Sequence, residues 1–203
     1  SYNSKAYIAD SRFRQFAEQP FYIYNSFGVK FYNNDVKWTQ GSYRYTSLFT
    51  FKTNDNSSHS GSDNIEIKNN IFSTNHYMGS ITSDDSNGGD TIIVSNNEFY
   101  SLESYNGFYL WSQNDNYILI NNNKFESLYY LIHDYEYGNA INVVGGDESI
   151  IRNNNFYNFE RPIKVDNNAT TVIENNIFNG NQYGFRADGS FINGQINNNL
   201  FYK

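Results

Sequence analysis

The segment Ile118-Leu119-Ile120-Asn121-Asn122-Asn123-Lys124-Phe125 decides the fold, because the chain carries six copies of its pattern. The pattern is a short run with apolar residues at alternate positions, followed by Asn-Asn, any residue and Phe. The other complete copies span residues 65–72, 92–99, 149–156, 171–178 and 194–201, and two degenerate copies span residues 8–13 and 31–36. Self-similarity of this kind is the sequence signature of a repeat architecture.

The spacing of the copies predicts a solenoid made of strands. Successive copies end 22 to 36 residues apart, and the separations of 22 and 23 residues recur, so the longer ones indicate insertions. Apolar residues alternate with a period of two, which is typical of strands and not of helices. A second alternating segment, such as Ile141-Asn142-Val143, follows the copies. We therefore expect an all-β solenoid of about eight coils, each with three short strands and one tight turn.

Stacked coils explain the unusual number of Asn residues. Asn enters the left-handed backbone region more readily than other non-Gly residues, which suits a tight turn. At a strand spacing of about 4.8 Å, Asn amides of successive coils can form a ladder, and the Phe rings can stack in a column. Twelve of the 35 Asn residues occupy the paired positions of the six complete copies, so the excess is mainly architectural.

These strings resemble the repeat of the right-handed parallel β-helix in the pectate-lyase-like superfamily. The resemblance covers nearly the whole chain and implies one right-handed, single-stranded parallel β-helix domain over residues 1–203, which we expect to be a segment of a longer surface protein. The superfamily includes polysaccharide lyases, hydrolases and epimerases, phage tailspikes and adhesin-like surface proteins. The chain is rich in Asn and Tyr and has no Cys, and in this it is most similar to the adhesin-like group.

The composition excludes several functional classes. Without Cys there are no disulfides, thiolate metal sites or cysteine nucleophiles. A net charge of −7 does not provide the basic surface that nucleic-acid binding requires. The sequence has no run of about 18 apolar residues, which a membrane-spanning helix would need. We expect no cofactor. The single weak metal candidate is a turn with Asp84, Asp85 and Asp90, which could hold Ca²⁺ but lacks the spacing of a calcium loop.

The predicted binding site lies on the outer side of the second alternating strand. Alternation places Tyr22, Tyr24, Tyr109 and Trp111 outward and Ala187 inward. Flat aromatic rings beside polar groups, as at Tyr109 and Trp111, suit a sugar. A predicted insertion over residues 129–139 is rich in Tyr, which offers a large contact area at low entropic cost. The predicted ligand-binding residues are Tyr109, Trp111, Tyr129, Tyr130, His133, Tyr135, Tyr137 and Asn142.

Four charged residues permit a catalytic interpretation as well. Asp166 and Asp188 occupy equivalent positions on successive coils, so their carboxyl groups could lie about 5 Å apart, near the separation in a retaining glycosidase. Lys164 and Arg186 lie beside them and could serve a lyase or hydrolase. Alternatively, these two cations neutralise a column of carboxylates, because stacked like charges repel.

The leading hypothesis is an extracellular, surface-attached module of adhesin-like type that binds a polysaccharide or another surface without catalysis. One alternative is a polysaccharide lyase, epimerase or hydrolase that acts on an acidic polysaccharide. Another is a structural stalk or filament subunit whose coils stack head to tail, because open solenoid ends expose strand edges.

Overall fold

The computed structural model describes residues 5–14, 16, 19–26, 28–38, 47–53, 64–75, 77–83, 90–101, 108–112, 117–128, 138–145, 148–166, 170–188 and 194–203. At residues 25, 26, 53, 83 and 108–112 the description covers the backbone alone. Every regular element in these ranges is a β-strand, which confirms the all-β prediction.

The strands form three parallel sheets, named here sheets A, B and C. Sheet A contains β1 (Ala6–Ala9), β4 (Gly28–Tyr32), β7 (Asn64–Lys68), β10 (Thr91–Ser95), β13 (Tyr117–Asn121), β16 (Glu148–Arg152), β19 (Thr170–Glu174) and β22 (Gln195–Asn197). Sheet B contains β2 (Arg12–Arg14), β5 (Asp35–Trp38), β8 (Ile71–Thr74), β11 (Glu98–Ser101), β14 (Lys124–Ser127), β17 (Asn155–Tyr157), β20 (Ile177–Asn179) and β23 (Leu200–Tyr202). Sheet C contains β3 (Phe21–Ser26), β6 (Ser47–Thr53), β9 (Tyr77–Ser83), β12 (Phe108–Ser112), β15 (Ile141–Gly145), β18 (Ile163–Asp166) and β21 (Phe185–Asp188).

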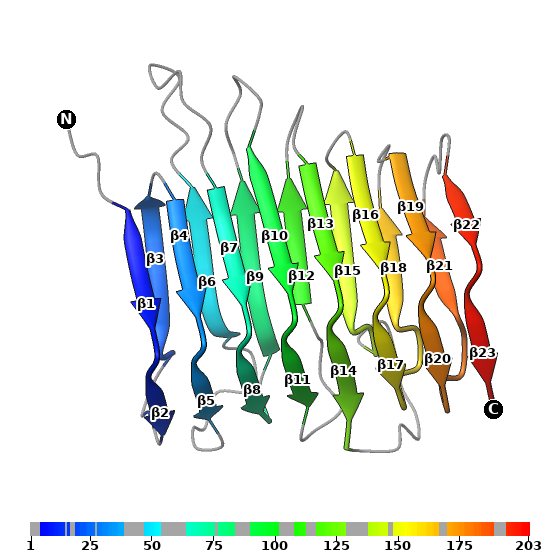
Figure 1. The fold of residues 1–203 in the computed structure, drawn as a ribbon, viewed down its shortest axis with the longest axis horizontal. Helices are drawn as coiled ribbons and strands as arrows, with labels where there is room; N and C mark the ends of the chain where they lie inside the picture. The colour runs from blue at the N-terminus through cyan, green and yellow to red at the C-terminus, as the bar shows by residue number, and fades with distance from the viewer. Residues whose placement is uncertain are drawn as a thin grey trace.

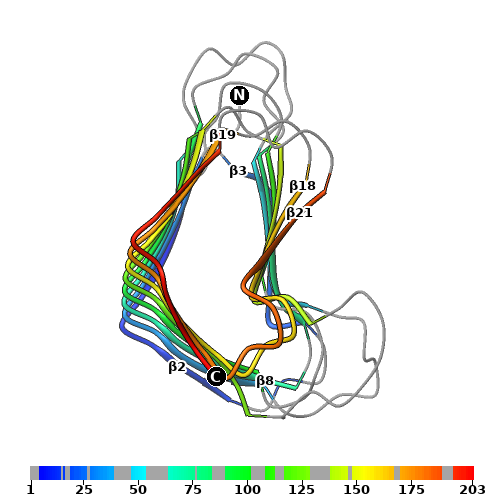
Figure 2. The same ribbon diagram turned by 90° about the vertical axis from the view of Figure 1, so that its right-hand side faces the viewer.

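The chain passes through sheets A, B and C in turn and then starts the next coil, so each of the first seven coils contributes one strand to each sheet, and the last described strands, β22 and β23, extend sheets A and B. Strands of one sheet therefore lie side by side in chain order (Figure 1). Viewed along the solenoid, sheets A and C face each other across the interior, and sheet B continues from sheet A after a bend (Figure 2). The predicted solenoid with three short strands per coil is confirmed.

The bend between sheets A and B explains why each copy needs two Asn residues. The first residue of the pair has a positive φ, between 51° and 58°, which is the left-handed conformation that Asn tolerates. These residues are Asp10, Asn33, Asn69, Asn96, Asn122, Asn153, Asn175 and Asn198. The second residue of each pair turns inward, and Asn34, Asn70, Asn97, Asn123, Asn154 and Asn176 are buried.

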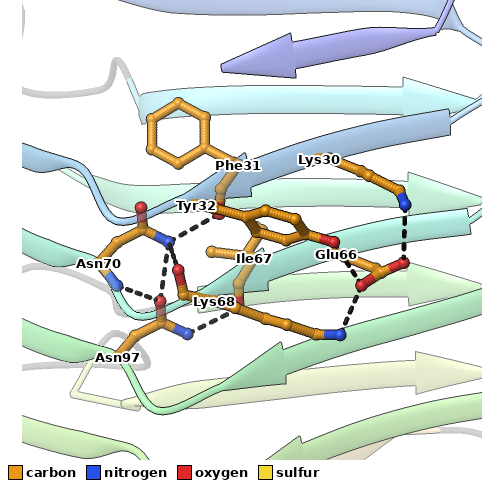
Figure 3. A network of polar contacts seen from close by, with 8 residues as sticks. All are labelled: Lys30, Phe31, Tyr32, Glu66, Ile67, Lys68, Asn70 and Asn97. Carbon is orange, nitrogen blue, oxygen red and sulfur yellow. Dashed lines mark hydrogen bonds and ion pairs between the residues drawn. The ribbon is translucent and has the colours of Figure 1, made fainter. Parts of the chain in front are cut away.

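The inward Asn side chains form the predicted ladder, and each amide contacts both neighbouring coils. The backbone N–H of Asn70 donates to Oδ1 of Asn97 at 2.9 Å, and Nδ2 of Asn70 donates to the carbonyl of Phe31 in the previous coil at 2.8 Å (Figure 3). The same pattern runs from Asn34 to Asn199. At the first coil, Ser11 replaces Asn, and its hydroxyl donates to the carbonyl of Ala9 at 2.8 Å. The ladder satisfies polar groups that would otherwise be costly to bury.

Six Phe rings stack as a column along sheet B; the first five are buried inside the solenoid, and Phe201 in the last coil is exposed. Their centroids are 4.8–5.2 Å apart and their planes differ by 5–11°. The rings belong to Phe72, Phe99, Phe125, Phe156, Phe178 and Phe201. The predicted Phe column is therefore confirmed, and together with the apolar residues of sheets A and C it forms the core.

The sequence analysis did not predict a second left-handed turn, between sheets B and C of two late coils. Asn158 has a φ of 61°, and Gly180 takes the equivalent place in the next coil with a φ of 65°. Oδ1 of Asn181 accepts a hydrogen bond from the backbone N–H of Phe159 in the previous coil at 2.8 Å, so an Asn side chain links the two coils at this turn as well. A side chain at Gly180 would come within 2.7 Å of Oδ1 of Asn158, which explains the glycine there.

Candidate functional site

The outer side of sheet C, named face C here, is where the sequence analysis placed ligand binding. Burial alternates along its described strands as predicted: Phe49 and Phe51 are buried, and Thr50 and Lys52 between and beyond them are partly exposed. The edge strand β21 differs, because Ala187 was predicted to point inward and is exposed. The strand register aligns one row of residues along the solenoid, formed by Tyr22, Thr50, Ser80, Tyr109, Asn142, Lys164 and Arg186.

Two exposed Tyr rings lie parallel to each other at the first coil of face C. Tyr22 and Tyr24 are 65% and 48% exposed, their planes differ by 1°, and their centroids are 6.2 Å apart. Nζ of Lys52 lies 5.2 Å from the centroid of Tyr24, and Nε2 of Gln19 donates to Oγ1 of Thr50 at 2.7 Å. Exposed parallel rings beside donors and acceptors are suited to stack on an apolar ring face. The sequence analysis placed both Tyr residues outward but did not include them in the predicted site.

The centre of face C contains the predicted residues of β12 and β15. The register places Tyr109 beside Asn142, and Trp111 beside Val144, while the side chains of β12 lie outside the description. Asn142 is partly exposed, and its Oδ1 has no hydrogen-bond partner in the described part of the chain. The other predicted ligand-binding residues all lie outside the described residues; they are Tyr129, Tyr130, His133, Tyr135 and Tyr137.

The late coils of face C bring together the four charged residues that the sequence analysis selected. Nζ of Lys164 lies 2.8 Å from Oδ2 of Asp166 and 3.5 Å from Oδ2 of Asp188. Nε of Arg186 lies 2.6 Å from Oδ1 of Asp188. Lys164 thus bridges the two carboxylates. The arrangement matches the alternative interpretation from the sequence, in which Lys164 and Arg186 neutralise stacked carboxylates.

The electrostatics of this cluster favour the charged forms of Lys164 and Asp188. The hydrogen bond from Arg186 and the nearby charge of Lys164 lower the pKa of Asp188, although desolvation opposes them. Desolvation also opposes the charge on Lys164, but its contacts with Asp166 and Asp188 outweigh it and raise the pKa of Lys164. A general acid needs a carboxyl whose pKa is raised. Asp188 is therefore poorly suited to donate a proton.

A second ionic cluster lies on the outer side of sheet A and was not predicted. Oε2 of Glu66 accepts hydrogen bonds from the hydroxyl of Tyr32 and from Nζ of Lys68, both at 2.5 Å, and Nζ of Lys30 lies 3.8 Å from Oε1 (Figure 3). Desolvation opposes ionisation of Glu66, but Lys68 and Tyr32 outweigh it and lower the pKa of Glu66. Desolvation and the bond to Glu66 raise the pKa of Tyr32. The cluster consequently pairs its charges within itself.

The described residues contain no group of three or more His, Asp or Glu side chains arranged to hold a metal ion. In the weak calcium candidate, Asp84 and Asp85 lie outside the description. Asp90 is buried. Within the described ranges, no helix is long and apolar enough to cross a bilayer.

Comparison with known proteins identifies the repeat and nothing finer. Residues 57–203 match the family model described as a right-handed beta helix region. No curated protein and no solved structure matches the chain significantly. The match covers more than half of the chain and includes the strands that carry the central and late parts of face C.

Proposed function

Because the chain belongs to the right-handed β-helix family, we propose that it is a non-catalytic, adhesin-like module that binds a glycan along face C at a cell surface. The fold supplies a long, rigid sheet whose outward residues are held in register from coil to coil. Such a surface can contact several units of a polymer at once. The proposal places the protein outside the cell, where surface polysaccharides occur.

The observation that carries the proposal is the pair of exposed, parallel rings of Tyr22 and Tyr24. A sugar ring has an apolar face of C–H groups and a rim of hydroxyls, so it stacks on an aromatic ring and forms hydrogen bonds at its edge. Tyr22 and Tyr24 are 65% and 48% exposed, so their parallel rings can contact the apolar face of a sugar without rearrangement. Thr50 lies in register next to Tyr22, and Ser80 lies next to Thr50 on the following strand, so the same row offers two hydroxyl groups to the rim.

The charged end of face C favours binding over catalysis. Both carboxylates contact Lys164, and Asp188 also contacts Arg186, so the four charges cancel locally. The lowered pKa of Asp188 is the reverse of what a general acid needs. The neutral balance of this end suits hydrogen bonding to sugar hydroxyls. Head-to-tail stacking into a stalk or filament stays a prediction from the sequence.

A glycan array followed by calorimetry on the strongest ligand tests the proposal. We expect the double variant Tyr22→Ala, Tyr24→Ala to weaken binding at least about tenfold, because each stacked ring contributes roughly 0.5–1.5 kcal/mol beyond its area burial. The matched control is Tyr7→Ala, since Tyr7 is 66% exposed but lies on sheet A. A second double variant, Tyr109→Ala with Trp111→Ala, tests the centre of the face.

Two outcomes would contradict the proposal. One is unchanged affinity in both double variants, which would remove face C as the site. The other is turnover: if the protein releases unsaturated products or new reducing ends from uronic-acid polymers, and Asp188→Asn abolishes this, the chain is an enzyme. Incubation of the wild type with such polymers, with time points over a day, distinguishes the two functions.

A further inference from the structure

Sheet A carries an unusual stripe of aliphatic side chains on its outer side. Strands β10, β13, β16 and β19 lie side by side (Figure 1), and the register aligns the middle residue of each strand. These residues, named here the apolar stripe, are Ile93, Leu119, Ile150 and Val172. All four are partly exposed and none belongs to the buried core. At a strand spacing of about 4.8 Å the stripe is about 14 Å long.

The stripe is distinct from its surroundings. In the preceding coils the same row holds Lys30 and Glu66, and in the following coil it holds Gln195. The solvent-facing side of a sheet normally carries polar residues. Four aligned aliphatic residues on that side therefore mark a contact surface. Figure 2 shows no described segment outside sheet A, so the described part of the chain leaves the stripe uncovered.

Strand β16 has opposite charges on the two sides of the stripe. Glu148 precedes Ile150 by two residues, Arg152 follows it by two, and all three point outward. Neither charged side chain forms an ion pair or hydrogen bond within the described part of the chain. The two flanks are therefore complementary to each other but too far apart along an extended strand, about 13 Å, to meet within one molecule.

We propose that a second copy of this chain packs on the apolar stripe, sheet A against sheet A, around a two-fold axis parallel to the solenoid. This symmetry sets β16 antiparallel to β16 of the partner, so that Ile150 faces its own copy. Glu148 then faces Arg152 of the second chain, and Arg152 faces the second Glu148, which gives two ion pairs. Tyr117 lies opposite Asn121 in the same way on β13. A self-complementary patch of this kind is what a two-fold interface requires.

Charge complementarity selects this arrangement over the other two-fold packing. In the other packing the axis would run across the centre of the stripe, between β13 and β16. Strand β16 would then face β13 of the partner, and the coil order would be reversed. Arg152 would then lie opposite Asn121, and Glu148 opposite Tyr117, with no ion pair. An axis one coil further on, between β16 and β19, would pair Arg152 with Glu174 of the second chain but would leave Glu148 opposite Thr170. Only the parallel axis gives both Glu148 and Arg152 an opposite charge. The inference is independent of glycan binding, because face C lies on the other side of the solenoid (Figure 2).

Analytical ultracentrifugation of the full chain from about 1 to 200 µM tests the dimer, a range that covers the affinity of a modest interface. We expect a concentration-dependent dimer in the wild type and a monomer in Leu119→Lys, which places a charge in the centre of the stripe. Leu119→Ser is a milder second variant in case the lysine disturbs folding, and it should weaken the dimer at least about tenfold. The double variant Tyr22→Ala, Tyr24→Ala on face C should dimerise like the wild type.

Charge reversal tests the pairing of the flanks. Arg152→Glu changes the net charge from −7 to −9, and Glu148→Arg changes it from −7 to −5. We expect each single variant to raise the dimer Kd about tenfold or more, because like charges face each other twice. The double variant keeps the net charge at −7 and should restore the wild-type Kd. A wild type that stays monomeric at 200 µM, or a double variant no better than the single ones, would overturn the proposal.

Discussion

Replacing one amide in the middle of the Asn ladder should destabilise the solenoid far more than replacing the neighbouring turn residue. Asn123 is buried, and its Oδ1 accepts the backbone N–H of Asn97 at 2.9 Å and Nδ2 of Asn97 at 3.0 Å. In Asn123→Ala both donors lose this acceptor in the interior. The carbonyl of Asn121 keeps the N–H of Asn96 at 3.2 Å, so it is not left without a partner.

The magnitude follows from the groups that lose their bonds. Nδ2 of Asn97 keeps one bond, to the carbonyl of Ile67 at 2.9 Å, so the groups left without an acceptor are its second N–H and the backbone N–H. Each such buried N–H costs roughly 1–3 kcal/mol, so the two cost about 2–6 kcal/mol. The comparison variant is Asn122→Ala, next to it in the chain. Asn122 has a φ of 56°, so Asn122→Ala should lower the stability only by the cost of holding alanine in the left-handed conformation, about 1–2 kcal/mol. Asn122→Gly should be tolerated, since glycine adopts this conformation without a steric cost.

Urea unfolding followed by circular dichroism measures the global effect, and hydrogen exchange at the N–H of Asn97 measures the local one. Local measurement matters because the stability of a solenoid is distributed over its coils and unfolding need not be two-state. We expect much faster exchange at Asn97 in Asn123→Ala than in Asn122→Ala. If the two variants lose the same stability, or if exchange at Asn97 does not change, the ladder does not stabilise the coils as argued.

Two further predictions concern the core and the ionic cluster of sheet A. Gly79→Ala should lose about 1–3 kcal/mol of stability, because the added methyl group would lie 2.2 Å from Cζ of the buried Phe49 ring; Phe49→Leu in the same chain should recover part of the loss in urea unfolding. Glu66→Gln should make stability less dependent on acid. The folded-state pKa of Glu66 is lowered, so its contribution is present above the unfolded-state pKa and is lost as the pH falls through the folded-state value. Urea midpoints from about pH 6 to pH 3 check this, and an equal fall of the midpoint in wild type and variant would contradict it.

The sequence predicted the fold well because the repeat records contacts between neighbouring coils. Each Asn of a pair has one task, the turn for Asn122 and the ladder for Asn123, and both tasks recur in every complete copy. The alternation also placed Tyr22 and Tyr24 outward correctly. Such features depend on local conformation and on the next coil, which is why a single sequence reveals them.

The sequence analysis missed features that depend on which residues face each other across coils. The middle position of the apolar run was treated as any residue, so the alignment of Leu119 with Ile150 was overlooked. Tyr32 and Glu66 lie in different coils and are not directly paired in the register of β4 with β7, so their hydrogen bond depends on how far the two side chains reach across the strands. The second left-handed turn escaped notice because Asn158 and Gly180 differ in type.

The ladder also determines where the chain tolerates extra length. Its successive members are separated by 22 to 36 residues, yet the hydrogen bonds between them stay within 2.8–3.1 Å. Each coil is thus fixed at the bend between sheets A and B, and length differences are absorbed at the other two corners. Because doubling the length of a flexible loop costs only about 0.6 kcal/mol, those corners can accept new segments while every strand keeps its register. The solenoid is therefore a scaffold on which loops can be exchanged one coil at a time.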